Sequence, residues 1–288
     1  MESSTMKNIM SMAIAGLFLL AGSVTGGERT PEPIKTLSPN TGSDIELKLS
    51  YESFQGMELD EADNFDGWTT TAEVSVPFLE RFRLRLTYPF RTEGDADLKD
   101  DQLVMPGESI DIEGNGGVFD FFTLQFEHQL KGMEEDGYGL SYYVGGGAVP
   151  SRLDTTKARP NGGFDAFNHT GTVILGGVRL DRQHGFGHGI FNLGLRYYAS
   201  SDDLSPSSND SFTVADLKGA LVFNPWGPVH PVVELTYLGD FSDVNQFSLI
   251  PELVVPLGRN VDLKAGATIG LGGNGSEFGA QAQAVVKF

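Results

Sequence analysis

The chain has 288 residues, and its 39 acidic and 20 basic side chains give a net charge of -19, which argues against nucleic acid as a partner. It contains no cysteine, which excludes disulfides, thiolate metal sites, cysteine nucleophiles and a lipid-modified N-terminal cysteine. The 37 glycines and the aromatic content of 10% are common in β-sandwiches and β-barrels, and the length suits one all-β domain.

Residues 1–26 have the order of a secretory signal peptide. Lys7 precedes an apolar run over 12–21, and small residues follow it. The run is too short to span a bilayer, so we expect cleavage between Ser23 and Gly27, with a membrane anchor as the alternative. No later segment is apolar for long enough to be a transmembrane helix, so any membrane crossing has to be made by strands.

A proline-rich lead over 27–43 is expected on the periplasmic side, and the remainder, 44–288, reads as alternating strands. In each strand apolar side chains occupy one face and mostly polar side chains the other. The predicted strands in chain order are 44–54, 68–78, 81–90, 118–130, 138–150, 168–181, 191–197, 216–224, 229–237, 247–255, 261–271 and 277–288.

The third predicted strand alternates most regularly. Leu84 and Leu86 lie on one face, whereas Arg83 and Arg85 lie on the other. Arginines are costly to bury in a sandwich core but are easily accommodated in a water-filled lumen. The sequence therefore predicts an all-β, transmembrane, antiparallel up-and-down β-barrel of about 12 strands, with a soluble sandwich as the alternative.

The connections and the last strand agree with a barrel of the bacterial outer membrane. Connections after odd-numbered strands are mostly longer than those after even-numbered strands, as expected for outside loops and periplasmic turns. The last strand ends on Phe288, which resembles the signal that the barrel-assembly machinery recognises. The expected partners are outer-membrane lipid, lipopolysaccharide, this machinery during biogenesis and a small-molecule solute.

Charged residues of both signs are expected to face the interior, which is narrow in a barrel of this size. They select what passes in one interpretation, and only fill and rigidify the barrel in the other. The predicted pore-lining residues are Lys48, Glu73, Arg83, Arg85, Glu127, Arg179, Arg196, Lys218, Glu234, Glu252 and Lys264.

Much of the acidic excess falls in the first two predicted outside loops. These carboxylates are solvated loop surface in one interpretation, and contact divalent cations or lipopolysaccharide in the other; no stretch matches an EF-hand loop. They are Glu58, Asp60, Glu61, Asp63, Asp66, Glu93, Asp95, Asp97, Asp100, Asp101, Glu108, Asp111 and Glu113.

The histidines do not support catalysis or metal binding. Thr170-Gly171-Thr172 follows His169, which therefore lacks the His-x-Ser motif of lipid A deacylases, and its context does not resemble the outer-membrane phospholipase. His184 and His188 fall in a glycine-rich predicted periplasmic turn that will not form the helix their spacing needs for metal ligation. We expect no catalytic residues, metal site or cofactor.

Two regions carry motifs of a known family. One runs from Val74 to Phe90 and ends on Tyr88-Pro89-Phe90; the other comprises Pro225-Trp226-Gly227-Pro228, residues 231–235, residues 266–272 and Phe288. Together they cover about a third of the chain and resemble the outer-membrane transporters of the MetA-pathway phenol-degradation family. The resemblance implies a barrel that admits small solutes, aromatic ones among them, and brings no catalytic residues. The long acidic second loop departs from it.

The expected function is a narrow passive channel or uptake protein for small solutes, aromatic or hydrophobic ones among them. A closed structural or surface-binding barrel with acidic extracellular loops is the alternative. A lipid-modifying outer-membrane enzyme is the third and least favoured hypothesis.

Overall fold

The computed structural model describes residues 31–39, 42–58, 62–98, 109–115, 122–148, 152–155, 172–199, 211–242 and 245–288. The predicted signal peptide and His169 lie outside the described residues, as do Asp60, Glu61, Asp100, Asp101 and Glu108. Where the chain is described, no helix is long and apolar enough to cross a membrane.

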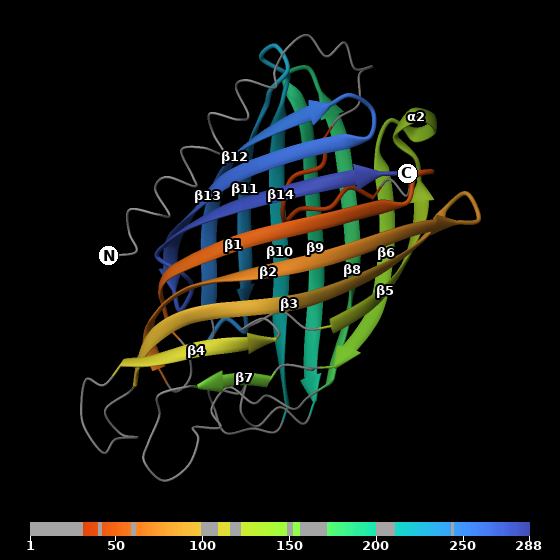
Figure 1. The fold of residues 1–288 in the computed structure, drawn as a ribbon. Helices are drawn as coiled ribbons and strands as arrows, with labels where there is room; N and C mark the ends of the chain where they lie inside the picture. Colours follow the sequence, from red (N-terminus) through yellow and green to blue (C-terminus); the bar gives the residue numbers. More distant parts are fainter. Residues whose placement is uncertain are drawn as a thin grey trace.

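The described residues are almost entirely β-strand (Figure 1). The elements are β1 (Glu46–Met57), β2 (Ala62–Phe78), β3 (Phe82–Leu98), β4 (Ser109–Asn115), β5 (Phe122–Lys131), α2 (Met133–Asp136), β6 (Gly139–Ala148), β7 (Arg152–Thr155), β8 (Thr172–His184), β9 (Gly187–Ala199), β10 (Ser211–Phe223), β11 (His230–Gly239), β12 (Asn245–Leu257), β13 (Val261–Gly273) and β14 (Phe278–Lys287).

Within the described ranges, twelve of these strands close into an antiparallel barrel. Each pairs with the next along the chain, and β14 returns to pair with β1 from Glu46 opposite Lys287 to Gln55 opposite Phe278. The remaining two strands, β4 and β7, lie outside the closed ring: β4 pairs with the outer part of β3, and β7 pairs with β4. Closure leaves the twelve strands without a free edge, so their backbone groups are paired as lipid requires. The predicted fold class is confirmed.

The alternation of side chains sorts the barrel into two surfaces. Large apolar side chains at alternate positions point outward and are exposed, whereas their neighbours point inward and are buried. In β3, Leu84 and Leu86 are exposed while Arg83 and Arg85 are buried, as predicted. The outward set on the other strands includes Leu49, Leu124, Val144, Ile174, Leu193, Leu195, Leu235, Leu253 and Ile269.

The outer rim differs from the prediction. Strands β2 and β3 have 17 residues each and continue well beyond the predicted strand ends, so Asp63, Asp66, Glu93, Asp95 and Asp97 lie on strands rather than in loops. Strand β4 carries Asp111 and Glu113, also assigned to a loop by the sequence. The prediction failed here because acidic residues have low strand propensity, and the pairing of three consecutive strands overrides it.

The opposite rim carries the short turns, and we take it as the periplasmic end. At the β8–β9 hairpin the strands extend to His184 and from Gly187, leaving only residues 185 and 186 as the turn. His184 and His188 therefore lie on strands, and their placement in a turn was wrong. His188 faces inward and contacts Asp181, with 3.1 Å between Nε2 and Oδ2.

The described part of the predicted periplasmic lead lies inside the barrel. Residues 31–39, named here the luminal segment, run within the ring of strands before the chain enters β1 (Figure 1). Ile34 and Thr36 are buried there. The sequence analysis expected the lead on the periplasmic side of the membrane. Residues 31–39 lie within the barrel instead, because their backbone amides find acceptors on its inner face.

Candidate functional site: the barrel lumen

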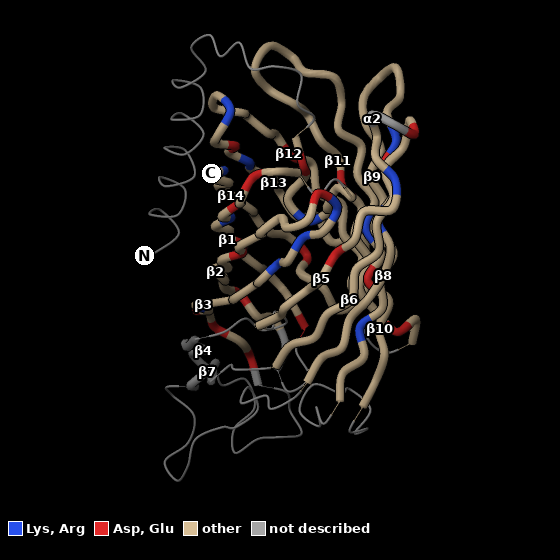
Figure 2. The backbone as a smooth tube through the Cα atoms, turned by 90° about the vertical axis from the view of Figure 1, so that its right-hand side faces the viewer, with Lys and Arg blue, Asp and Glu red and all other residues tan. Residues whose placement is uncertain are grey.

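The structure places all eleven predicted pore-lining residues on the inner face of the barrel. Eight are buried, and Glu73, Arg196 and Lys218 retain partial exposure toward the interior. Basic and acidic positions are interspersed along the strands (Figure 2). The inward direction of these side chains follows from period-two alternation. Their role as the lining of a pore stays a prediction, and what these charges do in the lumen depends on their partners.

One wall of the lumen holds a chain of ion pairs across β1, β2 and β3. Glu73 lies 2.7 Å from Nη1 of Arg85 and 3.1 Å from Nζ of Lys48. Lys48 also contacts Glu32 of the luminal segment at 2.6 Å. Two carboxylates and two cations balance within this cluster.

The neighbouring wall is built on β5, β6 and β8. Glu127 is 1% exposed, accepts a hydrogen bond of 2.7 Å from the Ser141 hydroxyl and pairs with the guanidinium of Arg179. Arg179 also donates to Gln125 Oε1 at 3.2 Å and lies over the ring of Tyr143, 4.3 Å from its centroid. These contacts satisfy the buried carboxylate.

Tyr143 reaches along the wall because glycines on the next two strands leave space for it. A Cβ atom built on Gly194 would lie 2.3 Å from the Tyr143 hydroxyl oxygen, and one on Gly177 would lie 2.8 Å from it. Either distance is too short for a real side chain. The sequence analysis did not detect this close approach.

The third wall, on β9 and β10, carries an unequal set of charges. Asp216 lies 2.6 Å from Nη2 of Arg196 and 3.1 Å from Nζ of Lys218. One carboxylate therefore faces two cations, and this wall has a net positive charge.

The luminal segment is held mainly through its backbone. The Glu234 carboxylate, which is fully buried, accepts hydrogen bonds from the backbone N–H groups of Lys35 and Thr36, with the Thr36 bond 2.6 Å long. The Glu252 carboxylate accepts the backbone N–H of Ile34 at 3.2 Å. Two predicted pore-lining carboxylates thus bind a peptide of the same chain.

Further contacts fix the segment along its length. Lys264 donates to the carbonyl of Pro33 at 3.0 Å. Asn192 accepts the backbone N–H of Leu37 at 2.8 Å and donates to its carbonyl at 2.7 Å. The Ser38 hydroxyl donates to Asp181 at 2.9 Å. The segment therefore bridges β8, β9, β11, β12 and β13.

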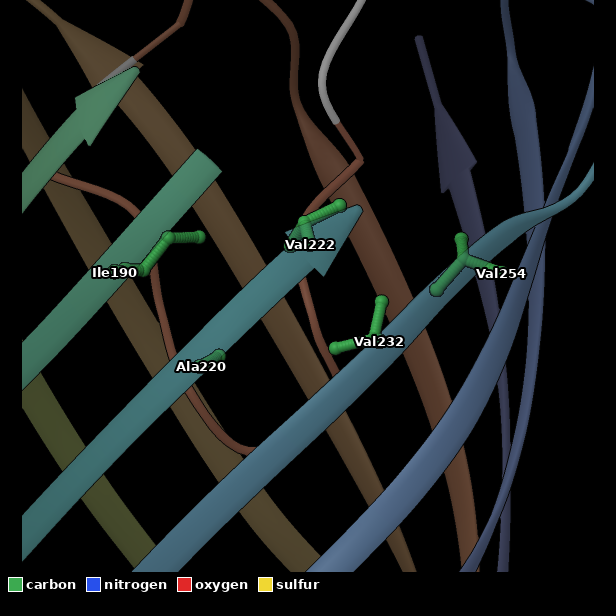
Figure 3. Close-up of a cluster of buried hydrophobic side chains, with 5 residues drawn as sticks. All are labelled: Ile190, Ala220, Val222, Val232 and Val254. Atoms are coloured by element: carbon green, nitrogen blue, oxygen red, sulfur yellow. The ribbon is translucent and has the colours of Figure 1, made fainter. Parts of the chain in front are cut away.

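Apolar clusters lie toward the two ends of the lumen. Near the periplasmic end, five inward side chains of β9–β12 form one cluster, across which the luminal segment passes (Figure 3): Ile190, Ala220, Val222, Val232 and Val254. Toward the outer end, Val173, Tyr198 and Val214 form a second cluster against Phe212 and Leu238. The sequence did not predict them, because these strands carry apolar residues on both faces.

Between the luminal segment and the outer cluster lies a cavity of about 190 Å³, named here the central cavity. Its lining includes Ile34, Lys35 and Leu37 of the luminal segment together with residues of all three walls. Among the described residues, five basic side chains and three acidic ones line it: Lys35, Arg85, Arg179, Arg196 and Lys218 against Glu52, Glu73 and Asp216. Arg179 is also paired with Glu127, which does not line the cavity.

The remaining predicted features are placed as follows. Phe288 is exposed at the periplasmic end, and its backbone N–H donates to the carbonyl of Ile45 at 2.9 Å; its role in assembly stays a prediction. Among the described residues, no three His, Asp or Glu side chains are grouped as a metal site would require. The role of the acidic rim residues stays a prediction as well.

A closed barrel with an apolar exterior and a charged interior defines the class of this protein. It is a transmembrane β-barrel of the bacterial outer membrane. The outward apolar side chains suit contact with lipid, and the charged side chains are kept away from lipid inside the barrel. No family model and no curated protein matches the chain.

The solved structures to which the chain is similar include the following three outer-membrane barrels. An outer-membrane channel from Pseudomonas putida F1 shares 13% identity at a TM-score of 0.49, over 92% of this chain and 100% of that one. The transport unit of the autotransporter AIDA-I from Escherichia coli shares 9% sequence identity at a TM-score of 0.49, over 95% of this chain and 96% of that one. The translocator domain of the autotransporter NalP from Neisseria meningitidis shares 12% sequence identity at a TM-score of 0.46, over 86% of this chain and 89% of that one.

Proposed function

We propose that the protein is a narrow channel for small solutes, with the luminal segment as its gate on the periplasmic side. The observation that carries the proposal is the central cavity, which lies inside the closed barrel with charged side chains in its wall. A barrel that served only as a membrane-embedded scaffold would gain stability from filling this space, because cavities cost free energy.

The contacts of the luminal segment suit a gate better than a permanent filling. Hydrogen bonds to Glu234, Glu252, Asn192 and Asp181 hold it, and all of them can be exchanged for water. Solutes entering from outside reach the central cavity first and pass to the periplasm when the segment shifts. The volume of the central cavity selects solutes by size, and the charged side chains in its walls select them by charge.

One alternative has support from a specific observation. The ion pairs and the luminal segment occupy much of the interior, which favours a closed barrel that acts through its outer surface. The resemblance to the MetA-pathway transporters, with its implication of aromatic solutes, remains a further hypothesis about what the channel carries. A measurement of current separates the two functions.

The test locks the luminal segment in place with an engineered disulfide. The chain has no cysteine, so the double variant Ser38→Cys with Asp181→Cys can form only one intramolecular disulfide, between side chains that touch at 2.9 Å in the native protein. The protein is refolded, inserted into a planar bilayer and recorded before and after reduction. The variant Ser38→Cys alone is the control, because it cannot form an intramolecular disulfide.

We expect discrete current steps from the control and from the reduced double variant, and their loss on oxidation. Equal currents in the oxidised and reduced double variant would show that solutes bypass the segment. If the wild type and the reduced double variant fold and insert but never pass current, the channel function is overturned and the closed barrel is supported.

A further inference from the structure

The central cavity combines a positive wall with apolar surfaces, and this combination defines a ligand class. Arg196 and Lys218 share the single carboxylate of Asp216, and both retain about a fifth of their side-chain surface exposed. Their surplus charge faces a cavity lined by more basic than acidic side chains in an otherwise strongly acidic protein. A surplus cation at low dielectric attracts an anion strongly.

The other two walls of the cavity also hold guanidinium donors whose hydrogen-bonding capacity is not fully used. In the part of the chain that the structure describes, Nε and Nη2 of Arg85 and Nε of Arg179 are buried without a hydrogen-bond partner. Buried donors are normally satisfied, so these guanidinium groups have capacity to donate to a further acceptor. A planar carboxylate is the acceptor that matches a guanidinium best.

Part of the remaining cavity wall is apolar, among neutral polar side chains such as Thr69, Thr123 and Gln281. Val173 and Leu175 line it on β8, and Ile34 and Leu37 line it from the luminal segment. Val173 also belongs to the outer apolar cluster, so apolar surface continues from the outer part of the lumen to the cavity. A ligand here would place a hydrocarbon body against these side chains and its charged end against the cations.

The size of the cavity sets the scale of that ligand. A protein cavity of roughly 150 Å³ holds one benzene molecule, and the central cavity has about 190 Å³. We propose that the central cavity binds small organic anions, each a single carboxylate on a short apolar body, and that these anions are the solutes of the channel. This inference rests on the proposed function and names its substrate class.

Binding can be measured without any current. Hexanoate is the probe and hexanamide the control ligand, since both have the same hydrocarbon chain and differ in the charge of the head group. Isothermal titration calorimetry is carried out on the full barrel in lipid nanodiscs, where the nonspecific partitioning of the two ligands can be subtracted using empty discs. We expect hexanoate to bind at least tenfold more tightly than hexanamide, as a charge-assisted contact implies.

Two substitutions at one ion-pair cluster should change hexanoate affinity in opposite directions. Lys218→Gln removes a surplus cation and leaves Asp216 paired with Arg196, so the variant keeps its fold and binds hexanoate roughly tenfold more weakly. Asp216→Asn removes the carboxylate that competes with the ligand, so affinity rises by a similar factor. Lys287→Gln is the matched luminal control, because Lys287 pairs with Asp262 near the periplasmic rim and does not line the cavity.

The outcomes separate the ligand class from the channel. Equal affinity for hexanoate and hexanamide, or the same effect in Lys218→Gln and Lys287→Gln, would overturn the inference even if the protein conducts. Opposite shifts in the two Asp216–Lys218 variants would support the ligand site; if the disulfide experiment then showed no current, the site would stand as a binding site while transport failed.

Discussion

Glu127 illustrates how single residues stabilise the interior of this barrel. Its carboxylate has no access to solvent and depends on Arg179 and Ser141 for compensation. Glu93 and Arg91 form a pair of the same chemistry on the outer part of β3, but there both side chains are more than a third exposed. The two pairs differ mainly in burial, so they isolate its effect.

We expect Glu127→Gln to destabilise the folded barrel by about 3 kcal/mol, because it leaves the buried Arg179 charge without its partner. Glu93→Gln should cost less than about 1 kcal/mol, because water screens the exposed pair. Urea unfolding in lipid vesicles, followed by tryptophan fluorescence, measures both. Equal costs would mean that the lumen is hydrated enough to screen Glu127 as well.

At the scale of elements, the outer ends of β2 and β3 bring like charges together. Asp95 on β3 lies directly opposite Asp66 on β2. Like charges directly opposite each other on neighbouring strands are destabilising. The outer ends of these strands should therefore be less stable than the membrane-embedded part of the same strands.

Asp95→Asn removes one charge of this pair and should stabilise this rim by about 0.5 kcal/mol. Backbone amides in the outer ends of β2 and β3 would then exchange hydrogen about twofold more slowly. Added salt should slow exchange in the wild type and have less effect in the variant, because it screens the same repulsion. Salt effects of the same size in both proteins would contradict the prediction.

At the scale of the whole molecule, the lipid-facing surface should tolerate charge only near its ends. Leu193 lies midway along β9 and faces outward, whereas Leu79 lies in the periplasmic turn between β2 and β3. Both leucines are exposed, so an arginine at either position would have space. Their surroundings differ only if the barrel crosses a bilayer.

Leu193→Arg should therefore destabilise the barrel by about 2–4 kcal/mol in lipid vesicles, while Leu79→Arg should cost no more than about 1 kcal/mol. Urea titrations of refolded protein compare them. If the two substitutions cost the same, the hydrocarbon region does not extend over Leu193, and the position of the barrel in the bilayer has to be revised.

The sequence by itself determined the strands, the two surfaces and the charged interior. Arg83 and Arg85 could be assigned inward and Leu84 and Leu86 outward because side-chain facing in a strand is local and has a period of two. The eleven interior charges followed from the same rule. Where both faces of a strand are apolar, as at Val232 and Val254, this rule does not tell inward from outward positions. The apolar cluster near the periplasmic end was therefore not predicted.

Only the tertiary structure decided what occupies the lumen. Lys264 contacts Pro33, and Glu234 contacts Thr36, across about 200 positions of sequence. Such contacts exist only once the barrel has closed, and no local pattern in residues 31–39 indicates them. Asp216 contacts both Arg196 and Lys218, and the positive charge of this wall of the central cavity follows from these contacts. They are likewise set by the register of β9 and β10 and by the packing of side chains in a closed ring.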